Sequence, residues 1–196
     1  MSDHDDPAQT AAALIQSLRE RRVLSLALAE EIGQERWNTL LLPGDRTAHA
    51  LYSHLLAWDE WATAVFELSA LRALHTNLVN AYRDVDGYTA RSVARFAGLR
   101  REDLLMGLQG ANARLISAAM GADGDAWYAR RIPYLAPPNA STPEKPSRGP
   151  SVSGLLRLLL NHEREHNEEI STVYGVSVNL EQFGAQSQEQ PPLSRT

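Results

Sequence analysis

Apolar residues recur at helical spacing in two segments of this chain, and histidines occupy positions in both series. In the first segment the steps are three and four residues, through Leu51, His54, Trp58, Trp61 and Val65. In the second segment the series runs through Leu155, Leu159, His162, His166, Ile170 and Val173. A period near 3.6 residues places each series on one side of a helix, where it faces the interior. The sequence therefore predicts two helices that point histidines into the core.

The first half of the chain is expected to contain one further helix and a turn. The helix begins at Asp6-Pro7, because Asp caps free N–H groups and Pro is tolerated in the first helical turn. Gly33 is the expected stop of this helix. Pro43-Gly44-Asp45 predicts a turn, after which Thr47 or Asp45 caps the helix that carries the first histidine.

The second half of the chain is expected to contain at least two more helices. Residues 69–98 indicate a short helix followed by a break at Asp84-Val85-Asp86-Gly87. A long helix is predicted from Arg101 to Met120, with acidic residues in a first turn that suits them through the helix dipole. The last helix is predicted from the N-cap residue Ser151 to Tyr174, and Gly175 suits the left-handed position past its end.

Proline-rich and polar segments separate and follow these helices. Residues 121–150 contain six prolines and predict a long irregular loop, and residues 176–196 predict a mobile tail. No segment has the pattern of a strand. We therefore predict an all-α fold, a four-helix bundle with short extra helices and a long Pro-rich loop before the last helix. Residues 1–175 would form one domain.

The charge balance argues against nucleic acid as a partner. The chain of 196 residues has 19 Lys and Arg against 24 Asp and Glu, which gives a net charge of -5. Phosphate contacts need clustered Lys and Arg, and the short arginine groups, such as Arg19, Arg21 and Arg22, are expected on a solvated face. No apolar run is long enough to span a membrane and no secretory signal opens the chain, so a cytoplasmic location is expected.

The absence of cysteine limits the chemistry that the chain can perform. Disulfides, thiolate metal ligands and a cysteine nucleophile are excluded. A metal ion must therefore be held by histidine, carboxylate or water, and any thiol chemistry needs a thiol from outside the protein.

The histidines of the two apolar series have the spacing of metal ligands. His162 and His166 are four residues apart, so both rings lie on one face of a helix. Two such imidazoles can hold one divalent ion, zinc or nickel, with bonds of about 2.0–2.1 Å. His54 is the expected third ligand, and three protein nitrogens leave a position open for water or a small-molecule substrate. The alternative is a set of core histidines bonded to one another, to carboxylates or to water.

Neighbouring side chains are candidates for supporting roles. Glu169, three residues after His166, is the first candidate for a carboxylate that orients a ligand or acts as a base, followed by Asp59 and Glu163. Most acidic candidates other than Glu169 are expected to be solvated charges. Three aromatic residues are candidates for substrate contacts: Trp58, Trp127 and Tyr128.

Residues 162–166 also match His-Glu-x-x-His, the zinc-protease helix motif, in which Glu163 is the general base. The Gly and His that extend the motif in metzincins are absent, because the chain continues Asn167-Glu168-Glu169-Ile170. Too few residues follow for the helix that supplies the glutamate ligand of gluzincins. No strand precedes the motif to hold an extended peptide, so a protease is disfavoured.

Two segments resemble the DinB-like superfamily. Residues 54–61, His-Leu-Leu-Ala-Trp-Asp-Glu-Trp, look like its second helix, and residues 159–170 are similar to its fourth. In that family, one histidine on the second helix and an H-x-x-x-H pair on the last long helix bind a divalent metal. This pattern carries over to His54, His162 and His166. The resemblance implies an up-down-down-up bundle over roughly residues 7–175.

The resemblance also implies a range of activities. Relatives include bacillithiol S-transferases, mycothiol-dependent maleylpyruvate isomerase and metal-dependent hydrolases, and a related branch acts in self-protection against a genotoxin. A metal-dependent enzyme that acts on a small molecule by thiol transfer or hydrolysis is therefore expected, with a low-molecular-weight thiol as cosubstrate in the first case. A homodimer would fit the family. The alternative is a stress-response protein that binds or sequesters a small molecule without catalysis.

Overall fold

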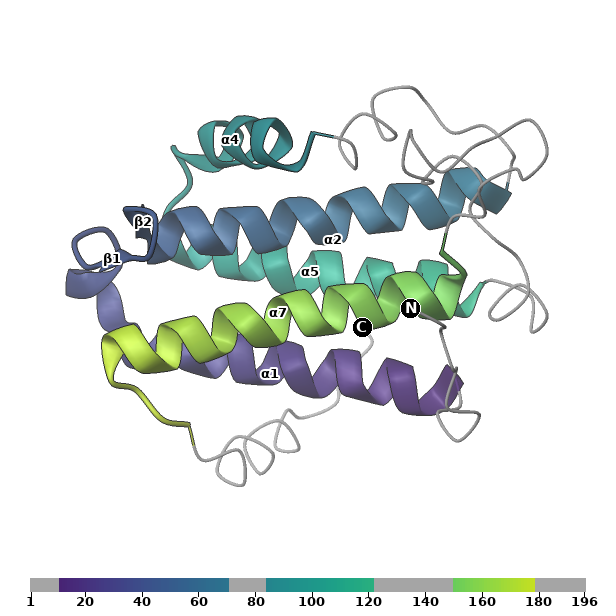
Figure 1. Cartoon of the computed structure of the whole chain (residues 1–196), viewed down its shortest axis with the longest axis horizontal. Coiled ribbons are helices and arrows are strands. Elements are labelled where there is room, and N and C mark those ends of the chain that lie inside the picture. The colour runs from purple at the N-terminus through teal and green to yellow at the C-terminus, as the bar shows by residue number, and fades with distance from the viewer. Residues whose placement is uncertain (1–10, 71–83, 122–149, 179–196) are drawn as a thin grey trace, which may run out of the picture.

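The computed structural model describes residues 11–70, 84–121 and 150–178, which are mostly helical (Figure 1). The expected all-α class is therefore confirmed. No helix within these ranges is long and apolar enough to cross a membrane.

Several predicted features lie outside the described residues. They are the start of the first helix at Asp6-Pro7, the short helix expected before residue 84, and the Pro-rich loop over residues 122–149. Of the predicted tail, the first residues are described, and Val176 and Val178 pack against the core.

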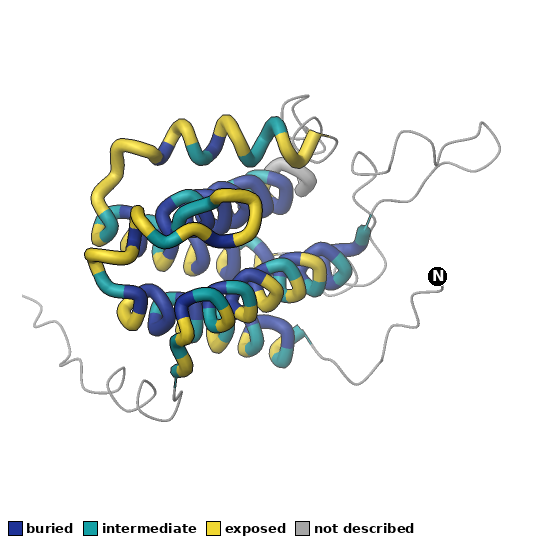
Figure 2. Tube along the Cα trace, turned by 60° about the vertical axis from the view of Figure 1, so that its left-hand side comes forward, coloured by how far each residue is buried: buried dark blue, intermediate teal, exposed yellow. Residues whose placement is uncertain are grey.

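Four long helices lie side by side and supply most of the core. They are α1 (Ala11–Arg36), α2 (Ala48–Ala70), α5 (Arg101–Met120) and α7 (Val152–Tyr174). α1 and α7 run in one direction, and α2 and α5 run in the opposite direction (Figure 1). α2 packs against α5 and α7, and α1 packs against α7 and α5. The buried faces of the helices therefore meet in the interior, and their outer faces are exposed (Figure 2).

The predicted ends of the last two long helices are confirmed. α5 begins and ends where the sequence indicates. At α7, the Ser151 hydroxyl accepts a hydrogen bond from the Gly154 N–H, and Gly175 takes the left-handed conformation with a φ of 63°. The end of α1 differs, because Gly33 (φ 70°, ψ 166°) departs from helical geometry but the helix resumes and ends at Arg36.

A short β-hairpin connects α1 to α2. Its turn is predicted from the sequence, whereas its two strands are not. β1 (Leu41–Leu42) and β2 (Arg46–Thr47) pair in antiparallel fashion. In the turn between them, Gly44 and Asp45 have positive φ values of 78° and 56°. Gly adopts this region without steric cost and Asp tolerates it better than bulkier residues do. The local sequence therefore favours a turn that brings the chain directly back to the start of α2.

Side-chain caps define where two helices begin. The Thr47 hydroxyl accepts a hydrogen bond from the first turn of α2, so Thr47 and not Asp45 is the cap. The carboxylate of Asp84 accepts a hydrogen bond from the Gly87 N–H and caps a further helix, α4 (Val85–Phe96). The break predicted at residues 84–87 is therefore wrong, because Asp84 starts a helix there. α4 packs along the outer side of α2 (Figure 1).

The core consists of two apolar clusters with a band of polar side chains between them. The first cluster includes Leu18, Leu115 and Leu155, and the second includes Leu28 and Leu108. On α1, α5 and α7 the two clusters occupy opposite ends of the helix. The polar side chains between them, with two from α2, form what we call the polar layer: Arg22, Ser25, His54, Asp59, Asn112, His162, Glu163, His166 and Asn167. Because an unpartnered polar group in a core is costly, the contacts of this layer must be specific.

Candidate metal centre

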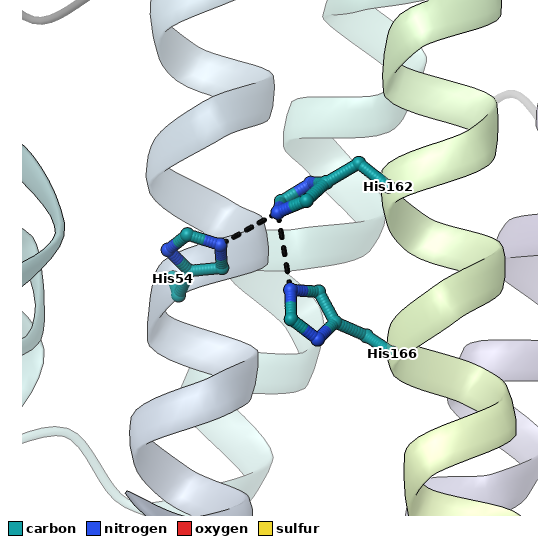
Figure 3. A group of neighbouring side chains, drawn as sticks. All are labelled: His54, His162 and His166. Carbon is teal, nitrogen blue, oxygen red and sulfur yellow. Dashed lines mark hydrogen bonds between the residues drawn. The ribbon is translucent and has the colours of Figure 1, made fainter. Parts of the chain in front are cut away.

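The side chains of His54, His162 and His166 converge between α2 and α7 (Figure 3). Nε2 of His162 lies 2.8 Å from Nε2 of His54 and 3.0 Å from Nε2 of His166. The ligand atoms of all three lie within 4.8 Å of one another, and among the described residues this is the group of acidic and histidine side chains that could hold a metal ion. His54 and His166 are buried, and His162 is partly buried. The structure thus brings together the three histidines that the sequence singles out.

Hydrogen bonds alone do not account for the two short contacts of the His162 Nε2 atom. The Nε2 atom of an imidazole carries either one proton or one lone pair, so it makes one well-directed hydrogen bond. Nε2 of His162 has two such neighbours, at 2.8 and 3.0 Å. An ion bonded to two imidazoles at about 2.0–2.1 Å, with about 90–110° between the bonds, holds their nitrogens about 2.8–3.4 Å apart. The separations of His162 from His54 and from His166 therefore both match those of nitrogens that share one ion.

All three imidazoles are held in the neutral form that a metal ligand needs. Burial and the neighbouring His162 and His166 lower the pKa of His54 to about 3. Burial and the neighbouring His166 lower the pKa of His162 to about 4. Burial also lowers the pKa of His166, and its hydrogen bond to Glu169 opposes this effect. At neutral pH each ring therefore carries one N–H and one nitrogen with a free lone pair, which can bind a metal ion.

Hydrogen bonds at the opposite ring nitrogens orient two of the histidines. Nδ1 of His54 lies 3.1 Å from Oγ1 of Thr89 on α4. Nδ1 of His166 lies 3.0 Å from Oε2 of Glu169. The ionised carboxylate of Glu169 can only accept, so it keeps the proton of His166 on Nδ1 and leaves the lone pair on Nε2, the arrangement usual for histidine metal ligands. The Thr89 hydroxyl can accept from Nδ1 of His54 in the same way. Glu169, the first carboxylate candidate, thus contacts one of the three histidines.

The β-hairpin supplies a cation next to this carboxylate. Nη2 of Arg46 donates to both carboxylate oxygens of Glu169, at 2.8 and 3.1 Å. The ion pair is partly buried, with 33% of the Arg46 side chain and 16% of the Glu169 side chain exposed. The positive charge of Arg46 contributes to the lowered pKa of all three histidines. Arg46, Glu169 and His166 therefore form a chain of contacts that leads from the hairpin to the centre.

Asp59 and Glu163 lie in the polar layer, and their hydrogen bonds go to α1. Nη2 of Arg22 donates to Asp59 at 2.7 Å, and Nε of Arg22 lies 3.2 Å from Glu163. Burial raises the pKa of Asp59, and the charge of Arg22 opposes that rise. The expectation of solvated charges is wrong for these three residues, because each is 5% exposed or less. Each charge is buried because its partner on another helix is buried with it.

Adjacent residues of α7 serve two different faces. The Ser25 hydroxyl on α1 hydrogen-bonds to Glu163 and Asn167. His162 and His166, each one residue earlier than these two, point toward α2 (Figure 3). Since successive residues of a helix are about 100° apart around its axis, the contacts with α1 fix the rotation of α7 that directs both histidines at His54.

Trp58 forms an aromatic wall beside the histidines. The centroid of its ring lies 6.1 Å from that of His54 and 6.2 Å from that of His162, with the rings close to perpendicular. Trp61 and Tyr88 pack against the same ring. Two other candidates for substrate contacts, Trp127 and Tyr128, lie outside the described residues.

Several residues that contact the centre or the polar layer are not predicted from the sequence. Arg46 lies in the two-residue strand β2, and Thr89 lies on α4, a helix that the sequence pattern does not predict. A pattern did exist on the last helix, where four residues spaced four, three and four apart form a second buried series: Glu163, Asn167, Ile170 and Tyr174. That series predicts that Glu163 and Asn167 are buried.

The chain was compared with protein families, curated proteins and solved structures. No protein-family model, curated protein or solved structure matches the chain significantly.

Acid should destabilise the metal-free protein through the histidine cluster. A histidine in an unfolded chain titrates near pH 6.5, whereas the pKa of His54 in the folded protein is about 3. Between these values the unfolded chain binds a proton that the folded protein does not, so the free energy of unfolding decreases as the pH falls. From pH 7 to pH 5, the metal-free wild type should lose about 1–2 kcal/mol more than His54→Gln in urea unfolding. The other titrating groups are common to both proteins, so equal losses would show that the fold does not hold His54 neutral.

Proposed function

We propose that this protein holds one divalent metal ion on His54, His162 and His166 and uses it as an enzyme that acts on a small molecule. The observation that carries the proposal is the approach of three Nε2 atoms from two helices, with separations of 2.8 and 3.0 Å along the two contacts. The lowered pKa values support it, because protons compete with the ion only in acid. The Glu169 carboxylate at Nδ1 of His166 supports it because it leaves the lone pair of that ring on Nε2, and the Thr89 hydroxyl can do the same for His54.

The type of ligand set favours catalysis over a purely structural ion. Structural zinc sites are closed by four protein ligands, whereas catalytic sites keep a position open. Within the described residues, the ligand group consists of three histidines. A bound ion would lower the pKa of a thiol or a water molecule, which suits a transferase or a hydrolase. Zinc or nickel suits imidazole ligands.

We further propose that the four long helices form a four-helix bundle of the DinB-like type. Two features support this assignment. The histidines occur on the second and the last of the long helices, and the helix directions follow the up-down-down-up order (Figure 1). Thiol transfer and hydrolysis are both compatible with this assignment.

Binding of the ion should stabilise the folded protein. An ion at about 100 times its dissociation constant adds about 2.7 kcal/mol to the free energy of unfolding, which raises the melting temperature by several degrees. We expect Zn²⁺ or Ni²⁺ to produce this shift in protein stripped with a chelator, and His162→Ala to abolish it. His49→Gln is the matched control, since His49 bonds to the backbone of Leu99 and not to the cluster. Absence of a shift in the wild type, together with no metal in elemental analysis, would refute the metal site.

Thr89 should contribute to metal affinity although it lies on a different helix from every ligand. Loss of the acceptor at Nδ1 of His54 should weaken Zn²⁺ binding about 10-fold or more in Thr89→Val. Thr63→Val is the control, because the Thr63 hydroxyl is buried and bonds to the Asp59 carbonyl instead of to a histidine. Competition with a fluorescent chelator measures both affinities, and equal affinities in the two variants would contradict the role of Thr89.

The enzymatic part of the proposal is tested with the metal-loaded protein. We expect turnover either of an electrophile in the presence of bacillithiol, mycothiol or glutathione, or of an ester or amide without thiol. His162→Ala should remove the activity. If neither reaction exceeds the rate of His162→Ala while the metal is bound, the protein binds a metal without catalysing these reactions.

A further inference from the structure

The charges around the three histidines leave a bound cation uncompensated. The imidazoles are neutral, so they add no charge to the site. Among the described residues, the carboxylate that hydrogen-bonds to one of these histidines is Glu169. Its charge is cancelled by Arg46, which donates to both of its oxygens at 2.8 and 3.1 Å. The side chains that contact the three histidines would therefore not neutralise a divalent ion, and a ligand at its open position is favoured when it is an anion.

The same site contains a buried hydrogen-bond donor without a partner. Trp58 is 7% exposed, and among the residues that the structure describes none accepts a hydrogen bond from its buried Nε1. Its ring packs beside His54 and His162, with centroid distances of 6.1 and 6.2 Å. Buried donors in folded proteins nearly always have an acceptor. A ligand bound at the ion would lie beside this ring and could be that acceptor.

The Trp58 indole N–H favours one class of anionic ligand over others. An indole N–H bonds well to oxygen, while sulfur is a weak acceptor. Trp58, Trp61 and Tyr88 pack together through their rings at 5.0 and 5.1 Å, so the side of the histidines next to Trp58 is aromatic. Such a wall suits a compact ligand with a planar anionic group.

We propose that the exogenous ligand of this centre is a small molecule with a carboxylate, which binds the metal ion and accepts a hydrogen bond from the Trp58 indole. This inference rests on the proposed metal site and names the class of compound that the site takes. Arg46 acts as a positioning residue. It neutralises Glu169 and so preserves the positive charge that attracts the carboxylate.

The two residues should have different signatures. Trp58→Phe keeps an aromatic ring but removes the donor, so it should weaken carboxylate binding and leave metal binding unchanged. Arg46→Met leaves the charge of Glu169 uncancelled beside His166. That variant should bind the metal at least as tightly as the wild type and bind the carboxylate less tightly. General structural damage would weaken both.

The experiment uses full-length protein loaded with Co²⁺, whose visible absorption reports on its ligands, and titrates it with acetate. Acetamide, a neutral molecule of the same shape, should change the spectrum at much higher concentration than acetate. The dissociation constant for acetate should rise about 3- to 10-fold in Trp58→Phe and about 10-fold in Arg46→Met. Trp37→Phe removes another buried, unpartnered indole N–H, and Arg100→Met removes an exposed cation. Both controls should match the wild type.

The outcomes separate the two proposals. If wild-type protein does not bind Co²⁺, the proposed metal site is refuted. If it binds Co²⁺ but acetate binds no better than acetamide, or if Trp58→Phe and Arg46→Met match their controls, the carboxylate proposal alone is overturned. A Co²⁺ protein that binds 2-mercaptoethanol more tightly than acetate would overturn it in favour of a thiolate ligand.

Discussion

The fold depends on the ion pairs and hydrogen bonds that a layer of buried polar side chains makes in the middle of an apolar core. Arg22, Asp59 and Glu163 are each at most 5% exposed, and Arg22 of α1 pairs with Asp59 of α2 and with Glu163 of α7. Removing Arg22 would strand both buried carboxylates, and breaking a buried ion pair in this way typically costs about 3–5 kcal/mol. The helices can therefore meet only in the register and rotation that keep these partners together. Three histidines belong to the same layer, so the contacts that fix the helices also fix the candidate centre.

The β-hairpin and α4 each add a side chain that contacts the candidate centre or its neighbouring carboxylate. The hairpin carries Arg46 to Glu169, and α4 carries Thr89 to Nδ1 of His54. Each of these contacts acts on a histidine from outside the pair of helices that supply the ligands. The centre thus has a buried side, held by the polar layer, and an outer side, held by the hairpin and α4. Histidine orientation is consequently set from two directions.

Much of the helical content could be predicted from local sequence. Helix α5 and helix α7 begin and end as predicted, because caps and terminators act within a few residues of where they occur. The sequence does not separate a break from a helix start at Asp84, because an acidic residue followed by glycine is compatible with either. It also does not predict the burial of Arg22, because that burial depends on two carboxylates that are distant in sequence. Charge pairing of this kind leaves no periodic pattern on the helix that carries the arginine.

The sequence by itself indicated that His54, His162 and His166 face inward, because apolar periodicity on a helix defines the inward face without knowledge of any partner. It also determined that a metal site must be built without thiolate, since the chain has no cysteine. Only the tertiary structure decided that His54 meets His162 and His166, and that Glu169 is held by Arg46 whereas Glu163 is turned toward Arg22. The physical reason is that a helix fixes the spacing of its own residues, while contacts between helices depend on rotation, register and the pairing of buried charges.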